Sequence, residues 1–333
     1  MSLPPAPGFA PSAARGAALD AAVRARLAES LDAIADSAED GIPCDRDAIR
    51  ALGRAVAAHP VRSAVMVRYT EAVTAVTAED LPATEAALAA LADPALRAPP
   101  GPALRVMTLR DADLGPGGAD AYRRVMDDDP ETPLAVLPLE EPALRAASAR
   151  VGDAIALLDD GFAEEIGAVA PEILAVRGRP GDRIQFDGAT SFHLWGCFAL
   201  NLGRPRHPIE LATAIAHESG HAVLFGLTMG GPVVANPDGE RYASPLREDA
   251  RPMEGIAHAT WVLARMHLAV SGMLGSGRLD ATGRAIAAQS LQSIARDYAA
   301  GLSVMARHAR LTEAGAAAFA PAEAYMASQG IGR

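Results

Sequence analysis

Two histidines four residues apart, His217 and His221, point more directly to chemistry than any other residues of this chain. On a helix, side chains at this spacing share one face with Cβ atoms about 5–6 Å apart, so both imidazoles can bind one divalent cation. Glu218 follows His217 in the sequence His-Glu-Ser-Gly-His and is expected to face the open side of the metal, where water or substrate would bind. The motif predicts a metal site with Glu218 as its catalytic residue. Two capped or buried histidines in an ordinary helix are the alternative interpretation.

The residues around the motif predict the helix that must position it. Pro208 suits the first turn of a helix, and Glu210 complements the positive end of the helix dipole. The sequence then continues without a helix breaker to Gly226, and the helix is expected to end at Gly230, Gly231 and Pro232. One stripe of this helix is expected to face inward with the metal ligands, and its members are Ala214, His217, His221 and Leu224.

A third metal ligand must come from another part of the chain, because two histidines do not complete a site. Glu254 and His258 are four residues apart on a helix that Pro252 is expected to begin. Glu254 as the ligand would give two histidines and a carboxylate, which suits zinc or non-haem Fe(II). His258 as the ligand would give three histidines, and Glu254 would then accept a hydrogen bond from the other nitrogen of a metal-bound imidazole. The spacing leaves both alternatives open.

The segments that follow the motif resemble a known family. The motif, the sequence Ser-Pro-Leu-Arg-Glu-Asp-Ala-Arg-Pro and the helix Glu-Gly-Ile-Ala-His-Ala-Thr-Trp-Val-Leu-Ala-Arg-Met together resemble the HExxH-type, 2-oxoglutarate-dependent peptide β-hydroxylases. The resemblance covers roughly residues 150–320 and is sharpest at 217–221 and 244–266.

The resemblance implies an Fe(II)/2-oxoglutarate-dependent dioxygenase that hydroxylates a Cβ in a ribosomally synthesised precursor peptide. Its iron ligands would be His217, His221 and His258, and zinc could replace iron in the isolated protein. The cosubstrate is 2-oxoglutarate, and the expected partner is the precursor peptide.

The distal carboxylate of 2-oxoglutarate needs a fixed cation, and an arginine can bind a carboxylate through two parallel hydrogen bonds. All 30 basic residues are arginines, so an arginine must supply this cation. Arg251 is the first candidate and Arg247 the second, and either could instead form an ordinary ion pair. The absence of lysine also excludes lysine Schiff-base chemistry.

Two other functions remain open. In a zinc metallopeptidase, Glu218 would be the general base that deprotonates metal-bound water, and Glu254 would be the third ligand. In a peptide-binding protein without activity, the metal would be structural and fully coordinated by protein ligands.

Composition narrows the possible partners and location. The formal net charge is -11 with no basic run, so a nucleic-acid partner is not expected. Cys44 and Cys197 are too few for a disulfide scaffold, and both are expected to be free buried thiols. The sequence shows neither a signal peptide nor an uncharged apolar run of about 18 residues, so we expect a cytoplasmic protein without a membrane partner.

The expected fold is α+β and mostly helical, with a zincin-like metal helix packed beside a small β-sheet. Three consecutive parts are predicted: a helical N-terminal region at 1–93, a Pro/Gly-rich connecting region with short strands at 94–149, and a catalytic domain at 150–333. The first dozen residues are expected to be disordered. Helical spacing is present at 17–37, 45–58, 62–77, 83–93, 151–174, 252–274 and 280–309.

Strands are predicted at 106–109, 134–139, 184–186 and 197–202. The run 195–202 could form an edge strand that pairs with an extended peptide substrate, and a central core strand is the alternative. His193, which precedes this run, is expected to be an ordinary core or surface histidine rather than a neighbour of the metal.

Overall fold

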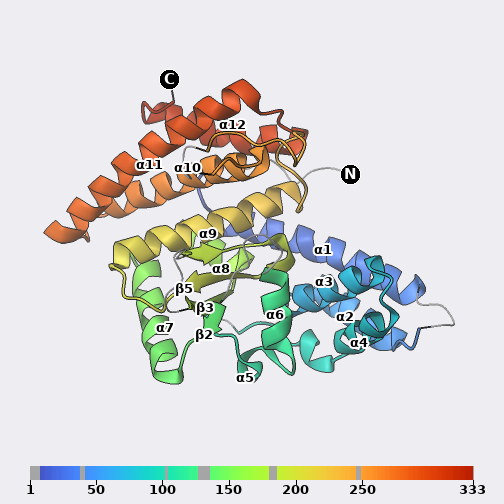
Figure 1. The fold of residues 1–333 in the computed structure, drawn as a ribbon. Helices are drawn as coiled ribbons and strands as arrows, with labels where there is room; N and C mark the ends of the chain where they lie inside the picture. The colour runs from blue at the N-terminus through green and yellow to red at the C-terminus, as the bar shows by residue number, and fades with distance from the viewer. Residues whose placement is uncertain are drawn as a thin grey trace. The chain divides into compact units, whose positions relative to one another are not determined.

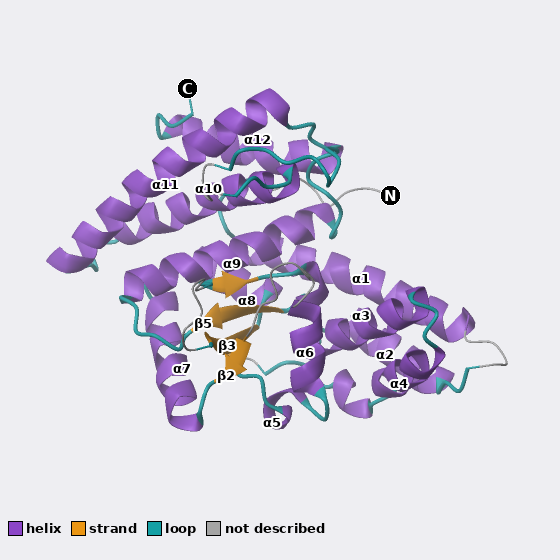
Figure 2. Cartoon of the chain, viewed as in Figure 1, coloured by secondary structure: helices purple, strands orange, loops and turns teal. Residues whose placement is uncertain are grey.

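A computed structural model describes residues 8–37, 42–101, 104–126, 136–179, 186–244 and 249–332. Within these ranges the chain is mostly helical and contains a small mixed sheet, which confirms that part of the predicted fold class (Figures 1 and 2). No helix in the described ranges is long and apolar enough to cross a membrane. Arg247 and residues 184–185 lie outside the described residues, so the second carboxylate-binding candidate and most of one predicted strand are not seen.

The chain forms two compact units, and each unit contains segments that are distant in sequence. Unit 1 comprises Met1–Gly16, Ala149–Ile166 and Arg206–Arg333, and unit 2 comprises Ala17–Ser148 and Gly167–Pro205. The predicted packing of the motif helix beside the sheet stays a prediction, because helix and sheet belong to different units.

Unit 2 begins with the helices that the sequence predicted. They are α1 (Ala13–Ser37), whose first residues up to Gly16 belong to unit 1, α2 (Arg46–Ala58), α3 (Ser63–Thr77) and α4 (Leu81–Leu91). Asp45 and Asp80 begin α2 and α4 by accepting hydrogen bonds from backbone N–H groups of the first turn. Short helices follow at Pro94–Arg97 (3₁₀), α5 (Asp111–Leu114) and α6 (Gly118–Met126).

The sheet of unit 2 is built around β3 (Glu172–Gly178). Strands β1 (Arg105–Met107) and β5 (Cys197–Asn201) pair with it in parallel, and β2 (Val136–Pro138) pairs with it antiparallel. β4 (Gly188–Ala189) pairs with the outer side of β5. The core against this sheet includes Met107, Tyr122, Leu174, Val176 and Ala199.

The idea that residues 195–202 form an edge strand is wrong. β5 lies between β3 and β4 in the sheet, and all five of its residues are buried. Its backbone is therefore already paired on both sides, as expected for a core strand. Phe186, the described end of the predicted strand 184–186, is not in a strand.

The single helix predicted at 151–174 is also wrong, because three elements share this stretch. Helix α7 (Glu141–Ile155) ends within the first residues of this stretch, a second helix, α8 (Asp160–Val169), follows, and Glu172 begins β3. The side chain of Asp159 accepts a hydrogen bond from the N–H of Phe162 and so starts α8. A short buried strand and a buried helical turn look alike in apolar spacing, which explains the error.

Unit 1 is dominated by four helices, α9 (Pro208–Thr228), α10 (Met253–Gly275), α11 (Ala281–His308) and α12 (Glu313–Ser328). The predicted helices at 252–274 and 280–309 are confirmed as α10 and α11, which run side by side (Figure 1). Their close packing depends on Gly301, since a Cβ there would lie 2.3 Å from Oγ1 of Thr260. Helix α10 also packs against α9, which carries the histidine motif.

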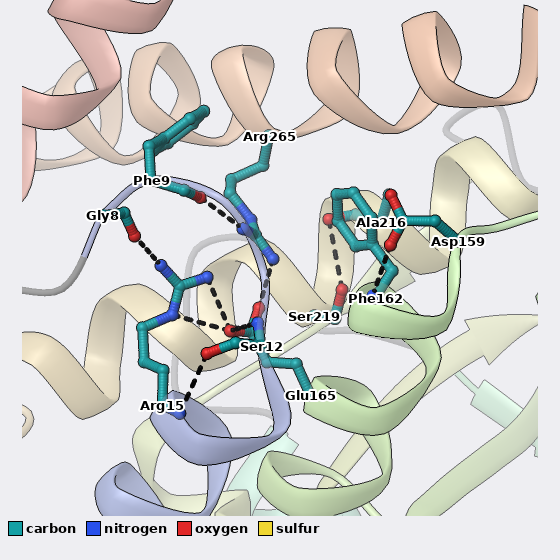
Figure 3. Close-up of polar contacts among 10 residues, drawn as sticks. All are labelled: Gly8, Phe9, Ser12, Arg15, Asp159, Phe162, Glu165, Ala216, Ser219 and Arg265. Carbon is teal, nitrogen blue, oxygen red and sulfur yellow. Dashed lines mark hydrogen bonds and ion pairs between the residues drawn. The ribbon is translucent and has the colours of Figure 1, made fainter. Parts of the chain in front are cut away.

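A buried cluster of charges ties the N-terminal segment of unit 1 to α8 and α10 (Figure 3). Glu165 forms ion pairs with Arg15, at 2.6 Å, and with Arg265, and the side chains of Glu165 and Arg265 are each 1% exposed. The carbonyl groups of Gly8 and Phe9 accept hydrogen bonds from Arg15 and Arg265 respectively. The ring of Phe9 is itself buried, so the expectation of disorder is wrong for residues 8–12, while residues 1–7 lie outside the described residues.

Candidate metal centre

Local signals in the sequence fix the helix that carries the motif. Its N-terminus is a capping box, in which the side chain of His207 accepts from the N–H of Ile209 and the carboxylate of Glu210 accepts from the N–H of His207. The left-handed backbone of Met229 and Gly230 ends it. The prediction of a helix from Pro208 to the glycines is therefore confirmed.

The motif histidines are half-buried rather than turned fully inward. The side chain of His217 is 36% exposed, and His221 is also of intermediate exposure. Of the predicted inward stripe, Leu224 is buried but Ala214 is not. The two imidazoles are thus partly covered by other residues of unit 1 and partly accessible to solvent.

His217 and His221 present their Nε2 atoms to each other at 3.2 Å. Two nitrogens that each lie about 2.1 Å from one cation are about 3.0 to 3.4 Å apart, depending on the angle at the metal. The ring planes are inclined at 67°, with centroids 4.9 Å apart. The two rings therefore converge as a pair of metal ligands would.

Glu218 lies close to this pair but is not turned to the solvent. Its side chain is 5% exposed, and its carboxylate oxygen lies 3.9 Å from Nε2 of His217. That distance exceeds the separation of about 3.0 to 3.4 Å expected for two neighbouring ligands of one metal ion. It leaves the carboxylate able to reach a water molecule bound beside the histidine pair.

His258 and Glu254 come from the first two turns of α10 and join the same cluster. Nδ1 of His258 lies 3.4 Å from Nδ1 of His221, and Nε2 of His258 lies 3.2 Å from the carboxylate of Glu254. That carboxylate also accepts from the N–H of Val233, at 2.9 Å, and the N–H of Val234, at 3.1 Å. Glu254 therefore holds an imidazole, as in one of the two alternatives from the sequence.

Met266 is a member of the cluster that the sequence did not indicate. Its Sδ lies 3.3 Å from Nδ1 of His217. A thioether sulfur accepts hydrogen bonds and cannot donate them, so Nδ1 of neutral His217 must be the donor. Met266 follows His258 by two turns on α10, but methionine at helical spacing usually indicates nothing more than packing.

The donor and acceptor types fix the tautomers of the three imidazoles in their neutral forms. Glu254 can only accept, so Nε2 of His258 donates to it and Nδ1 of His258 carries a lone pair. Nδ1 of His221 must then donate to His258. Nε2 of His221 and Nε2 of His217 are left with lone pairs that face each other at 3.2 Å.

Two facing lone pairs repel each other unless a cation lies between or beside them, so the residues present fit a divalent metal in donor type and separation. Only two protein nitrogens in the described part of the chain show this fit, Nε2 of His217 and Nε2 of His221. Among the described residues, no group of three or more His, Cys, Asp or Glu side chains is arranged to hold a metal ion. His258, predicted as the third ligand, is brought to the cluster with both of its nitrogens already engaged.

The electrostatics of the cluster favour neutral imidazole and ionised carboxylate. Burial, together with the neighbouring His217 and His258, holds the pKa of His221 well below its usual value. Burial raises the pKa of Glu254, but hydrogen bonds from His258, Val233 and Val234 outweigh it and the pKa is lowered. A neutral imidazole is the form that binds a metal.

The predicted carboxylate-binding arginine is engaged elsewhere. Arg251 pairs with Asp249 at 2.7 Å, and its backbone bridges to Tyr242. His193 is exposed and lies 3.5 Å from Oγ1 of Thr70 in unit 2, as expected for a histidine outside the site. Both cysteines are free, with Cys197 buried and Cys44 partly exposed.

Comparison of the sequence with protein-family models finds no match. Comparison with the curated proteins likewise finds none.

Proposed function

We propose that this chain is an Fe(II)/2-oxoglutarate-dependent hydroxylase that acts on a Cβ of a ribosomally synthesised precursor peptide. The observation that carries the proposal is the convergence of two segments distant in sequence. The pair His217 and His221 on α9 meets His258 and Glu254 on α10, and these are the segments in which the family resemblance is sharpest.

In this proposal His217 and His221 hold the metal through Nε2. When bound, Fe(II) would supply the redox chemistry with O₂ and 2-oxoglutarate. The protein supplies neutral, oriented imidazoles, and the partial exposure of His217 leaves room for ligands that are not protein groups. Glu218 would orient a bound water or the substrate from its buried position.

Arg251 is the candidate for the distal carboxylate of 2-oxoglutarate. Its guanidinium already pairs with the carboxylate of Asp249. Binding the cosubstrate would exchange one carboxylate partner for another, which preserves the charge pairing of the arginine. Arg247 remains the second candidate.

The test is an anaerobic titration of the Fe(II)-loaded protein with 2-oxoglutarate, followed by visible absorption. A saturable metal-to-ligand charge-transfer band is expected, because chelation of the iron by the cosubstrate produces it. His217→Ala should abolish the band. Absence of a band in the iron-loaded parent protein would overturn the proposal.

A zinc metallopeptidase is the second candidate function, and Glu218 favours it. A carboxylate 3.9 Å from a metal-binding nitrogen is placed to remove a proton from a metal-bound water. Glu254 as a zinc ligand is not favoured, since its carboxylate is occupied by two backbone N–H groups and His258. Peptide cleavage by the zinc-loaded protein without 2-oxoglutarate or O₂ would support this function.

A further inference from the structure

We infer that His258 is a positioning residue rather than a metal ligand, and that it forms, with Glu254, a hydrogen-bonded chain that orients His221 for metal binding. The inference rests on the proposed metal site at His217 and His221. It replaces the ligand role that the family resemblance implies for His258.

The ring geometry separates the two histidine contacts of His221. Toward His258 the ring planes are inclined at only 17°, and the 5.6 Å between centroids nearly equals the 3.4 Å nitrogen separation plus one ring radius at each end. The rings therefore lie edge to edge with their Nδ1 atoms pointing at each other. That orientation, at 3.4 Å, is the geometry of a long N–H···N hydrogen bond.

Toward His217 the arrangement differs in every respect. The planes are inclined at 67°, and the 4.9 Å between centroids is shorter than the 3.2 Å nitrogen separation plus two ring radii. The two Nε2 atoms therefore do not point directly at each other, and their lone pairs converge on a point beside the line that joins them. His221 thus offers Nε2 to a metal and Nδ1–H to His258.

The far end of the chain is the carboxylate of Glu254, which backbone N–H groups hold in place. Both oxygens of Glu254 face donors, with the N–H of Val233 and Nε2 of His258 near Oε1 and the N–H of Val234 near Oε2. A carboxylate is acceptor-only and satisfies them all. A glutamine would turn an NH₂ group toward a backbone N–H, so Glu254→Gln weakens the anchoring of His258 while nearly preserving the shape of the side chain.

A histidine ligand whose other nitrogen donates to a carboxylate, a carbonyl or water is fixed in tautomer and ring orientation, and losing that partner typically weakens metal binding about 10–100-fold. Here the partner of His221 is an imidazole, and the carboxylate lies one step further away. His217 has an analogous partner in Met266.

The experiment measures the affinity for Co(II) by competition with a chelator, together with the visible spectrum of the bound cobalt. The variants are His217→Ala, His258→Ala, His258→Asn, Glu254→Gln and the double variant His258→Ala/Glu254→Gln. Glu313→Gln is the matched control, because Glu313 is exposed in the first turn of α12. Far-ultraviolet circular dichroism checks that each variant is folded.

If His258 positions His221, His258→Ala and Glu254→Gln should each weaken cobalt binding about 10–100-fold and leave the spectrum of the saturated protein unchanged. The double variant should be no weaker than His258→Ala alone, because both changes act on one chain. His258→Asn should recover part of the loss, since its carboxamide oxygen can accept from Nδ1 of His221. His217→Ala should abolish binding.

If His258→Ala instead abolishes binding as His217→Ala does, or changes the spectrum at saturation, His258 is a ligand and the inference falls while the proposed metal site stands. Parent-like affinity in both His258→Ala and Glu254→Gln also overturns the positioning role. Parent-like affinity in His217→Ala removes the metal site itself.

Discussion

Glu218 keeps its carboxylate 3.9 Å from Nε2 of His217 although its side chain is 5% exposed. The carboxylate is therefore beside the predicted metal position without being a free surface group. Its place suits a proton acceptor for metal-bound water in a peptidase and an orienting group in a hydroxylase. The two candidate functions differ in what they require of this residue.

Glu218→Gln separates them. In a hydroxylase the variant should still bind Fe(II) and show the charge-transfer band with 2-oxoglutarate, since no general base is needed for chelation. In a peptidase the rate of cleavage should fall about 10²–10⁴-fold, the usual effect of losing a general base. Peptide cleavage assays and the anaerobic titration are run on the same preparation. Glu210→Gln, which alters the N-terminal cap of α9, shows how far a loss of helix stability alone affects the two measurements.

Metal binding should stabilise the fold if the pair at His217 and His221 exists only in the folded protein. A metal at about 100 times its Kd should raise the free energy of unfolding by about 2.7 kcal/mol. Thermal unfolding with and without Co(II) measures this. The increase should disappear in His221→Ala and persist in His193→Ala, and an equal increase in both variants would place the metal elsewhere.

The stability of the metal-free protein should decrease as the pH falls below about 6.5. Burial lowers the pKa of His267 from 6.5, so the unfolded chain binds more protons than the folded chain in this range. The stabilising contribution is complete above the unfolded pKa and is lost as the pH falls toward the folded pKa. Burial of His221 acts with the same sign.

Urea unfolding between about pH 5 and 8 tests this dependence. His267→Gln should reduce the slope of unfolding free energy against pH relative to the parent, since one of the buried imidazoles is gone. His193→Gln, at an exposed position, is the control. An unchanged slope in His267→Gln would contradict a contribution of the buried His267 imidazole to the pH dependence of stability.

Removal of Glu165 should destabilise unit 1 strongly. The residue pairs with Arg15 and Arg265, whose guanidinium groups are buried with it (Figure 3). Burial lowers the pKa of Arg265 to about 10 while Glu165 is present, and removing that carboxylate would take the counterion away from a buried guanidinium group. Glu165→Ala should cost about 3–5 kcal/mol of unfolding free energy, as expected for breaking a buried ion pair.

The neighbouring Glu164 is exposed and provides the control. Glu164→Ala should change the unfolding free energy by less than about 0.5 kcal/mol. Chemical denaturation of both variants gives the comparison. Similar losses in the two variants would show that the ion cluster does not act as described.

Helices with strong local signals were predicted well from the sequence, and the short buried elements were not. The caps and breakers around α9 and the aspartates before α2 and α4 act within one turn, so they are visible in the sequence. The stretch 151–174 carried apolar spacing that suited a helix, yet its end is the central strand of a sheet. Which of these forms depends on neighbours distant in sequence.

The division into units was also beyond the sequence. Segments 8–16 and 149–166 join the C-terminal helices in unit 1, although the intervening residues belong to unit 2. Long-range ion pairs such as that between Arg15 and Glu165 contribute to this arrangement. No change in composition along the chain marks the boundaries between the segments of the two units.

The sequence by itself determined that His217 and His221 share one helix face, because the four-residue spacing and the helix signals around it are local properties of the backbone. Only the tertiary structure decided what Glu254, His258 and Met266 do. Their roles depend on the packing of α10 against α9 and on the backbone N–H groups of Val233 and Val234. Spacing places Glu254 and His258 on one face of their helix, but hydrogen-bond partners from other segments decide which nitrogen of His258 donates and which accepts.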